Sequence, residues 1–213
     1  MDWQRILYYL PGILLGLTVH EFCHAFAAYK LGDNTARDQG RLTFNPIKHI
    51  DLIGLLFIVF AGFGWAKPVQ FNPGNLQNVR RDKAIIAAAG PLSNFVLGII
   101  LVLSVRFLID YHERNNIGIT TLVYHIYIIL FSAASINFGL FIFNLLPIPP
   151  LDGSHIVFSG LNLSYEKEEK IRKIGMPLLF LILILQRYTG ITLLPIGIAI
   201  DALMKFFLYF NIN

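Results

Sequence analysis

Two histidines and a glutamate within five consecutive positions are the residues best suited to chemistry in this chain of 213 residues. They form the pattern His20-Glu21-x-x-His24. On a helix that turns about 100° per residue, positions 20 and 24 lie only about 40° apart, so both imidazoles can reach one tetrahedral metal ion. The Glu21 carboxylate lies beside the first histidine, where it can take a proton from a water at the metal. The pattern therefore predicts a hydrolytic zinc site.

These three residues lie inside an apolar run, about residues 6–31, that is long enough to cross a membrane with some tilt. Each ionisable side chain at such a depth costs about 2.5–3.5 kcal/mol on insertion scales. A divalent cation supplies the charge that satisfies all three. The alternative is a pair of packed histidines without a metal, and the cost of inserting them argues against it.

Two histidines leave a third protein ligand to be found. The buried candidates are Asp152, His155, His125 and Asp201. Depth favours Asp152, because His24 lies about 10 Å inside the end of its helix and the third apolar run, which Asp152 follows, ends at the same face. His155 follows three residues later and stays open as the alternative. His125 lies at the opposite end of its run, and Asp201 has an ordinary explanation in pairing with Lys205.

The composition is that of an integral membrane protein. The chain is 55% hydrophobic and 14% charged, whereas soluble domains carry roughly 25% charged residues. The cations behind its net charge of +4 flank apolar runs, which indicates membrane topology and no nucleic-acid partner. The single cysteine, Cys23, excludes an internal disulfide and a zinc site made of several cysteines.

We expect one membrane-embedded domain, residues 1–213, with an all-α fold and about five transmembrane helices. The predicted spans are residues 6–31, 84–109, 122–146, 174–185 and 191–210. The first three form a catalytic core, about residues 5–160, and C-terminal helices cover about 168–210. The apolar island at 52–63 is too short to span. With the stretch from Trp65 to Phe71 it predicts a small membrane-associated hairpin or β element.

Lysines and arginines are divided unequally between the two faces that alternating spans define. Four lie on or beside the face of the N-terminus: Arg5, Arg106, Arg114 and Arg187. Eleven lie on the other: Arg37, Arg41, Lys48, Lys67, Arg80, Arg81, Lys83, Lys167, Lys170, Arg172 and Lys173. By the positive-inside rule the second face, toward which the candidate site lies, is cytoplasmic.

The histidine pattern and two later motifs together resemble the site-2 protease family of intramembrane zinc peptidases, peptidase family M50. The later motifs are Ala89-Gly90-Pro91-x-x-Asn94 and Asn144-Leu145-x-Pro147-x-x-Pro150-x-Asp152-Gly153. The loop text Gly40-Arg41-Leu42-Thr43-Phe44-Asn45-Pro46 is similar to that of short bacterial and archaeal members. The resemblance covers about residues 12–160, in which no inserted PDZ-like domain is obvious.

The resemblance implies a role for each matching residue. His20, His24 and Asp152 would ligate one Zn²⁺ per chain, and Glu21 would act first as general base and then as general acid. Asn144 would steady the tetrahedral oxyanion. Asn94, Trp65 and Val69 would contact substrate, with the hairpin adding an extended substrate segment as a further strand.

The predicted function is that of a zinc metalloendopeptidase. It would hydrolyse peptide bonds in or near transmembrane segments of membrane proteins, in the plasma membrane of a prokaryote. Its expected partners are a substrate helix and the bilayer, and its oligomeric state is left open. Two other functions fit the residues alone: a membrane zinc hydrolase of lipid amides, and a metal-binding membrane protein without catalysis.

Overall fold

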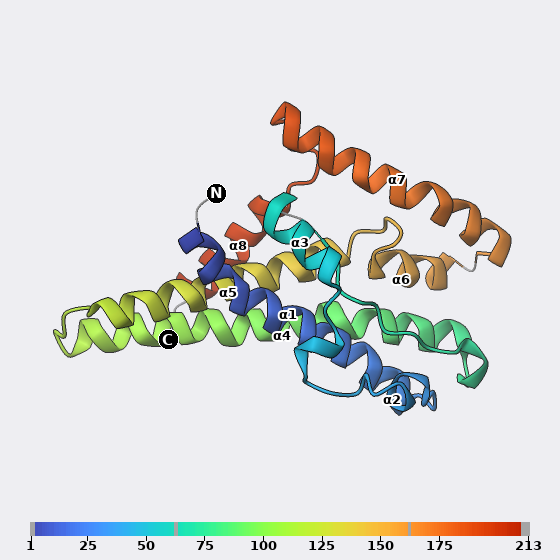
Figure 1. Ribbon diagram of the computed structural model, residues 1–213, viewed down its shortest axis with the longest axis horizontal. Helices are drawn as coiled ribbons and strands as arrows, with labels where there is room; N and C mark the ends of the chain where they lie inside the picture. Colours follow the sequence, from blue (N-terminus) through green and yellow to red (C-terminus); the bar gives the residue numbers. More distant parts are fainter. Residues whose placement is uncertain (1–2, 62–63, 162, 210–213) are drawn as a thin grey trace.

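A computed structural model of the chain describes residues 3–61, 64–161 and 163–209. Its centre is a bundle of three long helices, α1 (Trp3–Lys30), α4 (Val79–Arg114) and α5 (Thr121–Asn144), which pack against one another along their lengths (Figure 1). These are the helices of the described residues that are long and apolar enough to cross a membrane. The predicted all-α membrane fold with a three-helix core is therefore confirmed.

Small residues let the three long helices approach closely, as is common between helices in membranes. A Cβ added to Gly12 of α1 would lie 2.6 Å from the Cα of Ala133 on α5. A Cβ added to Gly98 of α4 would lie 2.7 Å from the ring of Phe138, which is fully buried on α5. The backbone of α1 therefore lies directly against α5, and both lie against α4.

Shorter elements surround this bundle. They are α2 (Thr35–Asp38), α3 (Leu52–Ala61), α6 (Asp152–Leu161), α7 (Tyr165–Thr189), α8 (Ile196–Tyr209) and the 3₁₀ turns η1 (Pro46–Lys48) and η2 (Pro73–Asn75). Helix α6 packs on α4, and α8 packs on α5 and α4. Helix α7 lies apart from the bundle (Figure 1) and approaches the rest of the chain where Gly175 meets Pro149.

The two predicted C-terminal spans correspond to α7 and α8. Unlike the three core helices, neither is both long and apolar enough over its described residues to qualify as a membrane span. The charged stretch at 166–173, which precedes the predicted span at 174–185, forms the start of α7. Ion pairs between Lys170 and Glu166, at 2.8 Å, and between Lys173 and Glu169, at 2.9 Å, support that helical turn. The count of five spans stays a prediction, and residue 210 lies outside the described part.

The predicted hairpin takes a different form. Residues 52–61 form α3, whose first turn is capped by Asp51: its Oδ1 accepts the Gly54 N–H at 2.8 Å. Residues 64–72 are extended, and the described residues contain no strand, only one antiparallel bridge between Ile50 and Ala66. Residues 62–63 lie outside the description. A short apolar run does not distinguish helix from strand, and here the Asp51 cap favours a helix.

Candidate metal centre

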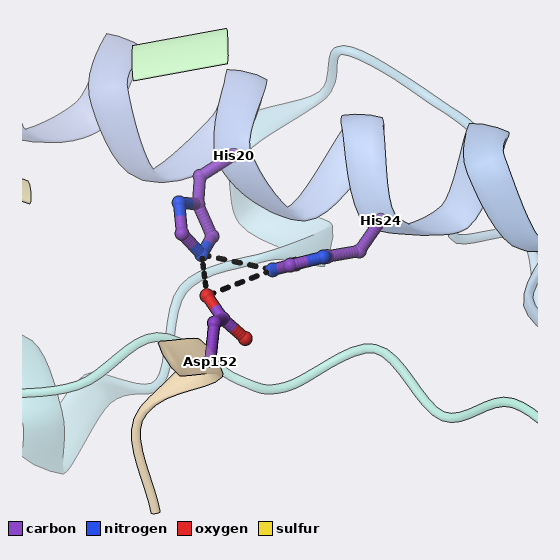
Figure 2. A group of neighbouring side chains, drawn as sticks. All are labelled: His20, His24 and Asp152. Atoms are coloured by element: carbon purple, nitrogen blue, oxygen red, sulfur yellow. Dashed lines mark hydrogen bonds and ion pairs between the residues drawn. The ribbon is translucent and has the colours of Figure 1, made fainter. Parts of the chain in front are cut away.

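Side chains from two helices distant in sequence converge on one point. His20 and His24 project from α1 toward Asp152, the first residue of α6 (Figure 2). The Asp152 Oδ2 atom lies 3.1 Å from His20 Nε2 and 3.3 Å from His24 Nε2, and the two nitrogens are 2.9 Å apart. Among the described residues, these three form the group of potential ligands that could hold a metal ion.

The path into α6 places Asp152 at this depth. Residues 145–151 form a tight turn rich in proline, and α6 begins immediately after it. A Cβ on Gly153 would collide with the carbonyl group of Leu145 and lie 2.6 Å from the carbonyl oxygen of Leu146. Only glycine therefore permits α6 to start so close to the end of α5. The Asp152 side chain keeps 19% of its surface exposed, so the centre is not sealed.

Hydrogen bonds on the far side of each ring fix the tautomers of the two histidines. His24 Nδ1 lies 2.7 Å from the backbone carbonyl oxygen of Ile86, and His20 Nδ1 lies 2.6 Å from Asn94 Oδ1. Oxygen atoms of carbonyl groups only accept hydrogen bonds, so each Nδ1 carries the proton. Each neutral ring then presents the lone pair of Nε2 to the centre, as metal-binding histidines do.

The arrangement is unfavourable without a cation and fits one well. With both rings neutral and protonated at Nδ1, two Nε2 lone pairs would face each other at 2.9 Å, and Asp152 Oδ2 is buried without a hydrogen bond. A tetrahedral ion with bonds of about 2.0–2.1 Å separates its ligand atoms by roughly 3.3 Å, close to the observed distances. Two imidazoles and one carboxylate are a typical set of protein ligands for zinc in hydrolytic enzymes.

Helix α4 closes the centre from a third side at Gly90. A Cβ at this position would run into His24 Nε2 and lie 2.7 Å from Cε1 of His20. Gly90 is itself buried, so the absent side chain leaves the space that the ligand rings and an ion need.

Glu21 is 7% exposed and lies beside the two histidines on α1. Its Oε2 accepts a hydrogen bond from the backbone N–H of Val69 at 2.9 Å. The buried guanidinium of Arg41 holds the same extended segment, because Nη2 donates to the carbonyl oxygen of Lys67 at 2.5 Å and Nη1 to that of Pro68 at 3.3 Å. The Lys67 N–H in turn donates to the His49 carbonyl oxygen at 2.8 Å.

Asp33, just beyond α1, anchors the far end of this segment. Its buried carboxylate accepts hydrogen bonds from the Asn72 N–H at 2.9 Å, from Asn75 Nδ2 at 2.7 Å and from the Thr35 hydroxyl at 2.6 Å. Burial by itself would raise the pKa of Asp33, but these hydrogen bonds outweigh it and lower that pKa below its ordinary value. The segment at 67–72 is thus tied to the loop after α1 at both ends.

The remaining predicted residues lie in different surroundings. Asn94 is fully buried behind His20 and therefore contacts a ligand, not an open substrate surface. Asn144 is half-buried and donates from Nδ2 to the Leu140 carbonyl oxygen of its own helix at 3.0 Å. Trp65 is 39% exposed and packs on Phe57 of α3. The roles predicted for these residues stay predictions.

The alternative ligands have partners of their own. His155 Nδ1 lies 3.3 Å from Arg172 Nη2 on α7. Burial, and then the charge of Arg172, lower the pKa of His155, so its ring stays neutral at neutral pH. His125 Nδ1 shares a hydrogen bond with the Tyr8 hydroxyl, 2.7 Å away. Neither ring belongs to the group around Asp152.

Three residues of the site region escape reasoning from sequence. Arg41 enters the sequence analysis as a cation of the cytoplasmic face and as part of the loop text at 40–46, without a role at the site, and His49 is a loop residue without a motif spacing of its own. Asn137, on α5, lies next to Asn94. An asparagine inside the apolar run 122–146 is a signal that could have been used, because an amide in a membrane span needs a hydrogen-bond partner.

Comparisons with known proteins show which family this chain resembles. The family model described as Peptidase family M50 matches residues 8–186. The chain is 40% identical over 166 residues to "Putative zinc metalloprotease YwhC" of Bacillus subtilis (strain 168), covering 72% of this chain and 73% of that protein. It is 33% identical over 159 residues to "Putative zinc metalloprotease Rip2" of Mycolicibacterium smegmatis, covering 72% and 57%. No solved structure matches the chain.

Proposed function

The chain belongs to peptidase family M50, and from that premise we propose that it is a zinc-dependent metalloendopeptidase of the membrane. Its substrates would be membrane proteins, cut at peptide bonds in or beside their transmembrane segments. The observation that carries the proposal is the convergence of His20 Nε2, His24 Nε2 and Asp152 Oδ2 next to Glu21 in a bundle of membrane-length helices. The names of the relatives, which refer to zinc metalloproteases, support zinc as the ion.

His20, His24 and Asp152 would hold one zinc ion and leave a fourth position for water or substrate. When bound, zinc polarises the scissile carbonyl group and makes a proton of water easier to remove at neutral pH. The chain supplies three fixed ligand atoms and a buried surrounding of low polarity, in which such charge effects are larger than in water.

Glu21 would carry the proton. The Val69 N–H holds Oε2 and thereby orients the carboxylate. Glu21 takes a proton from the attacking water as the water oxygen bonds to the carbonyl carbon. It then gives that proton to the amide nitrogen as the carbon–nitrogen bond breaks, which leaves a free carboxyl group and a free amine.

Asn144 would stabilise the negative charge that develops on the carbonyl oxygen. One N–H of its amide donates to Leu140, and the amide has a second N–H to offer. Donors of this kind typically contribute about 10²–10³-fold to the rate when they are aimed at a developing oxyanion.

The extended segment at 64–72 would receive the substrate. A peptide bond inside a helix is shielded by the helix's own hydrogen bonds, so the substrate must unwind before attack. An extended backbone beside Glu21 offers the unwound substrate a partner for hydrogen bonds. Trp65 and Val69 would contribute side-chain contacts there. The excess of lysine and arginine on the same face supports a site near the cytoplasmic side of a prokaryotic plasma membrane.

The test compares the purified wild type with Glu21→Gln, Asp152→Ala and His155→Ala in detergent, using zinc content and cleavage of a transmembrane substrate as measurements. We expect Glu21→Gln to keep zinc and lose at least about 10²-fold in cleavage rate. Asp152→Ala should lose both, and His155→Ala should keep zinc. Full cleavage by Glu21→Gln would remove the proposed base, and zinc lost from His155→Ala but kept by Asp152→Ala would reassign the third ligand.

A further inference from the structure

A chain of buried amides links α5 to the metal centre through α4. Asn137 Nδ2 donates to the Ala133 carbonyl oxygen at 2.8 Å, and Asn137 Oδ1 accepts from Asn94 Nδ2 at 2.9 Å. Asn94 Oδ1 lies 2.6 Å from His20 Nδ1. We propose that Asn137 is a positioning residue of the metal centre, which acts through Asn94 to keep His20 in the tautomer that presents Nε2 to the ion. This inference rests on the proposed zinc function.

Two backbone carbonyl groups fix the direction of every hydrogen bond in this chain. The Ala133 carbonyl oxygen can only accept, so Asn137 must turn Nδ2 toward it and Oδ1 toward Asn94. The Gly16 carbonyl oxygen also only accepts, and Asn94 Nδ2 donates to it at 3.0 Å. Asn94 must therefore turn Oδ1 toward His20, whose Nδ1 then has to carry the proton.

Asn137 supplies half of what holds the Asn94 amide in this orientation. One N–H of Asn94 donates to Gly16 on α1 and the other to Asn137 on α5. A half-turn of the amide would place Nδ2 against His20 Nδ1 and move the proton of that ring to Nε2, where it would block the metal. The same half-turn would set Oδ1 of Asn94 against two other oxygen atoms, one from Gly16 and one from Asn137.

The protein shields both amides from bulk water. Asn94 and Asn137 are both fully buried. A Cβ on Gly16 would lie 3.1 Å from Asn137 Oδ1, so this glycine lets the α1 backbone approach the amides. A buried donor that loses its partner here stays unpaired, and the Asn94 amide is then less firmly oriented.

The experiment measures zinc affinity by competition with a chromophoric chelator for purified wild type, Asn94→Leu, Asn137→Leu and the double variant. Loss of the partner of a metal-binding histidine typically weakens metal binding by about 10–100-fold, which we expect for Asn94→Leu. Asn137→Leu should weaken zinc binding by about tenfold. The double variant should match Asn94→Leu, because Asn137 acts only through Asn94.

Phe138→Leu is the matched control. Phe138 is the next residue on α5 and is fully buried in the apolar core. Its replacement should lower stability but leave zinc affinity within about twofold of wild type. The visible spectrum of the Co²⁺-substituted protein, which reports ligand geometry, should change in Asn137→Leu and not in Phe138→Leu.

Two results would overturn the inference while leaving the proposed function intact. One is a zinc affinity of Asn137→Leu within twofold of wild type. The other is a double variant whose loss of zinc affinity is the product of the two single losses. A wild type that binds no zinc would overturn both the inference and the proposed function. If Asn137→Leu does not accumulate, Asn137→Asp decides. A buried carboxylic acid stays neutral and keeps one donor and one acceptor. Its zinc affinity should lie within threefold of wild type, and a loss as large as that of Asn94→Leu would contradict the inference.

Discussion

Gly90 shows how much the centre depends on a side chain that is absent. The residue belongs to α4, yet its Cα faces the two ligand rings of α1. Any Cβ there would occupy the space between them. The close approach of α4, and not a polar contact, is what Gly90 contributes.

Gly90→Ala should therefore abolish zinc binding without unfolding the helix. Alanine favours a helix over glycine by about 0.8–1.0 kcal/mol, so the secondary structure should remain. We expect zinc affinity to fall by more than about 100-fold, measured by chelator competition, with an unchanged circular dichroism spectrum. Gly197→Ala on α8, where a Cβ meets nothing within 4 Å, is the control and should bind zinc normally. Normal zinc content in Gly90→Ala would contradict the close packing.

Arg41 is the second residue on which function should depend without touching the metal. The residue is 6% exposed, and its guanidinium donates to two successive carbonyl oxygens of the segment that holds Glu21. Lysine cannot bind both oxygens in the same planar geometry. Arg41→Lys should keep zinc and lower kcat by about 10–100-fold through misplacement of Glu21.

Lys67→Ala is the control for that substitution, because only the backbone of Lys67 takes part and its side chain is exposed. It should cleave substrate at the rate of wild type. Equal rates for Arg41→Lys and wild type would show that the segment is held without the guanidinium.

At the scale of residues, the sequence predicts the candidate ligands better than it predicts the residues that hold those ligands in place. The spacing of His20 and His24 follows from helix geometry alone, and depth favours Asp152 over His155. What the spacing cannot reveal is the direction in which the side chains of Asp152 and His155 point, because that depends on the turn at 147–151. The role of Asn137 likewise cannot be predicted from the sequence, because it depends on how α5 packs against α4 and brings the amide to Asn94.

At the scale of elements, the end of the extended segment at 64–72 is held to the loop after α1 by the hydrogen bond from the Asn72 N–H to Asp33. Because the pKa of Asp33 is lowered in the folded state, its stabilising effect is complete above the unfolded pKa, about 3.9. It is lost as the pH falls through the folded pKa, when the carboxylate takes up a proton.

Asp33→Asn should lower the thermal unfolding temperature near neutral pH. The amide NH₂ of the new side chain would face groups that themselves donate hydrogen bonds, which should lower the free energy of unfolding by about 1–3 kcal/mol. The difference from wild type should stay constant near neutral pH and shrink below about pH 4. Differential scanning fluorimetry in detergent measures it. Asp38→Asn, at an exposed carboxylate on α2, should leave the curve unchanged. A difference that does not depend on pH would mean that Asp33 is not the group that titrates.

The elements differ from the sequence-based prediction where local signals compete. The apolar island predicted at 52–63 fits a strand or a helix, and the Asp51 cap favours the helix that residues 52–61 form. The charged stretch at 166–173 lies outside the predicted span at 174–185 but belongs to α7, where ion pairs form along one face. The long helices α1, α4 and α5 are predicted well because each contains an apolar run long enough to span a bilayer, and strands or surface helices rarely contain such a run.

At the scale of the whole molecule, the positions of the lysines and arginines predict how the protein is oriented in the membrane. The turn between α4 and α5 would lie on the face with four of these residues, and the start of α7 on the face with eleven. The three-helix core is consistent with this alternation, since α4 and α5 are antiparallel neighbours (Figure 1).

Cysteine labelling in intact cells tests this orientation. In a Cys23→Ser background, Gly118→Cys lies in the turn after α4 and Lys170→Cys lies on the exposed start of α7. A maleimide that does not cross membranes should label Gly118→Cys in intact cells and Lys170→Cys only after lysis. The reverse result would place the candidate site outside the cytoplasm.

Zinc K-edge X-ray absorption of the purified protein tests the central claim, that two imidazoles and one carboxylate bind a single zinc ion. The first shell should contain only nitrogen and oxygen, at about 2.0–2.2 Å, with imidazole scattering from two rings. Asp152→Ala should lose this signal. A sulfur shell near about 2.3 Å, which would implicate Cys23, or a spectrum that Asp152→Ala leaves unchanged, would contradict it.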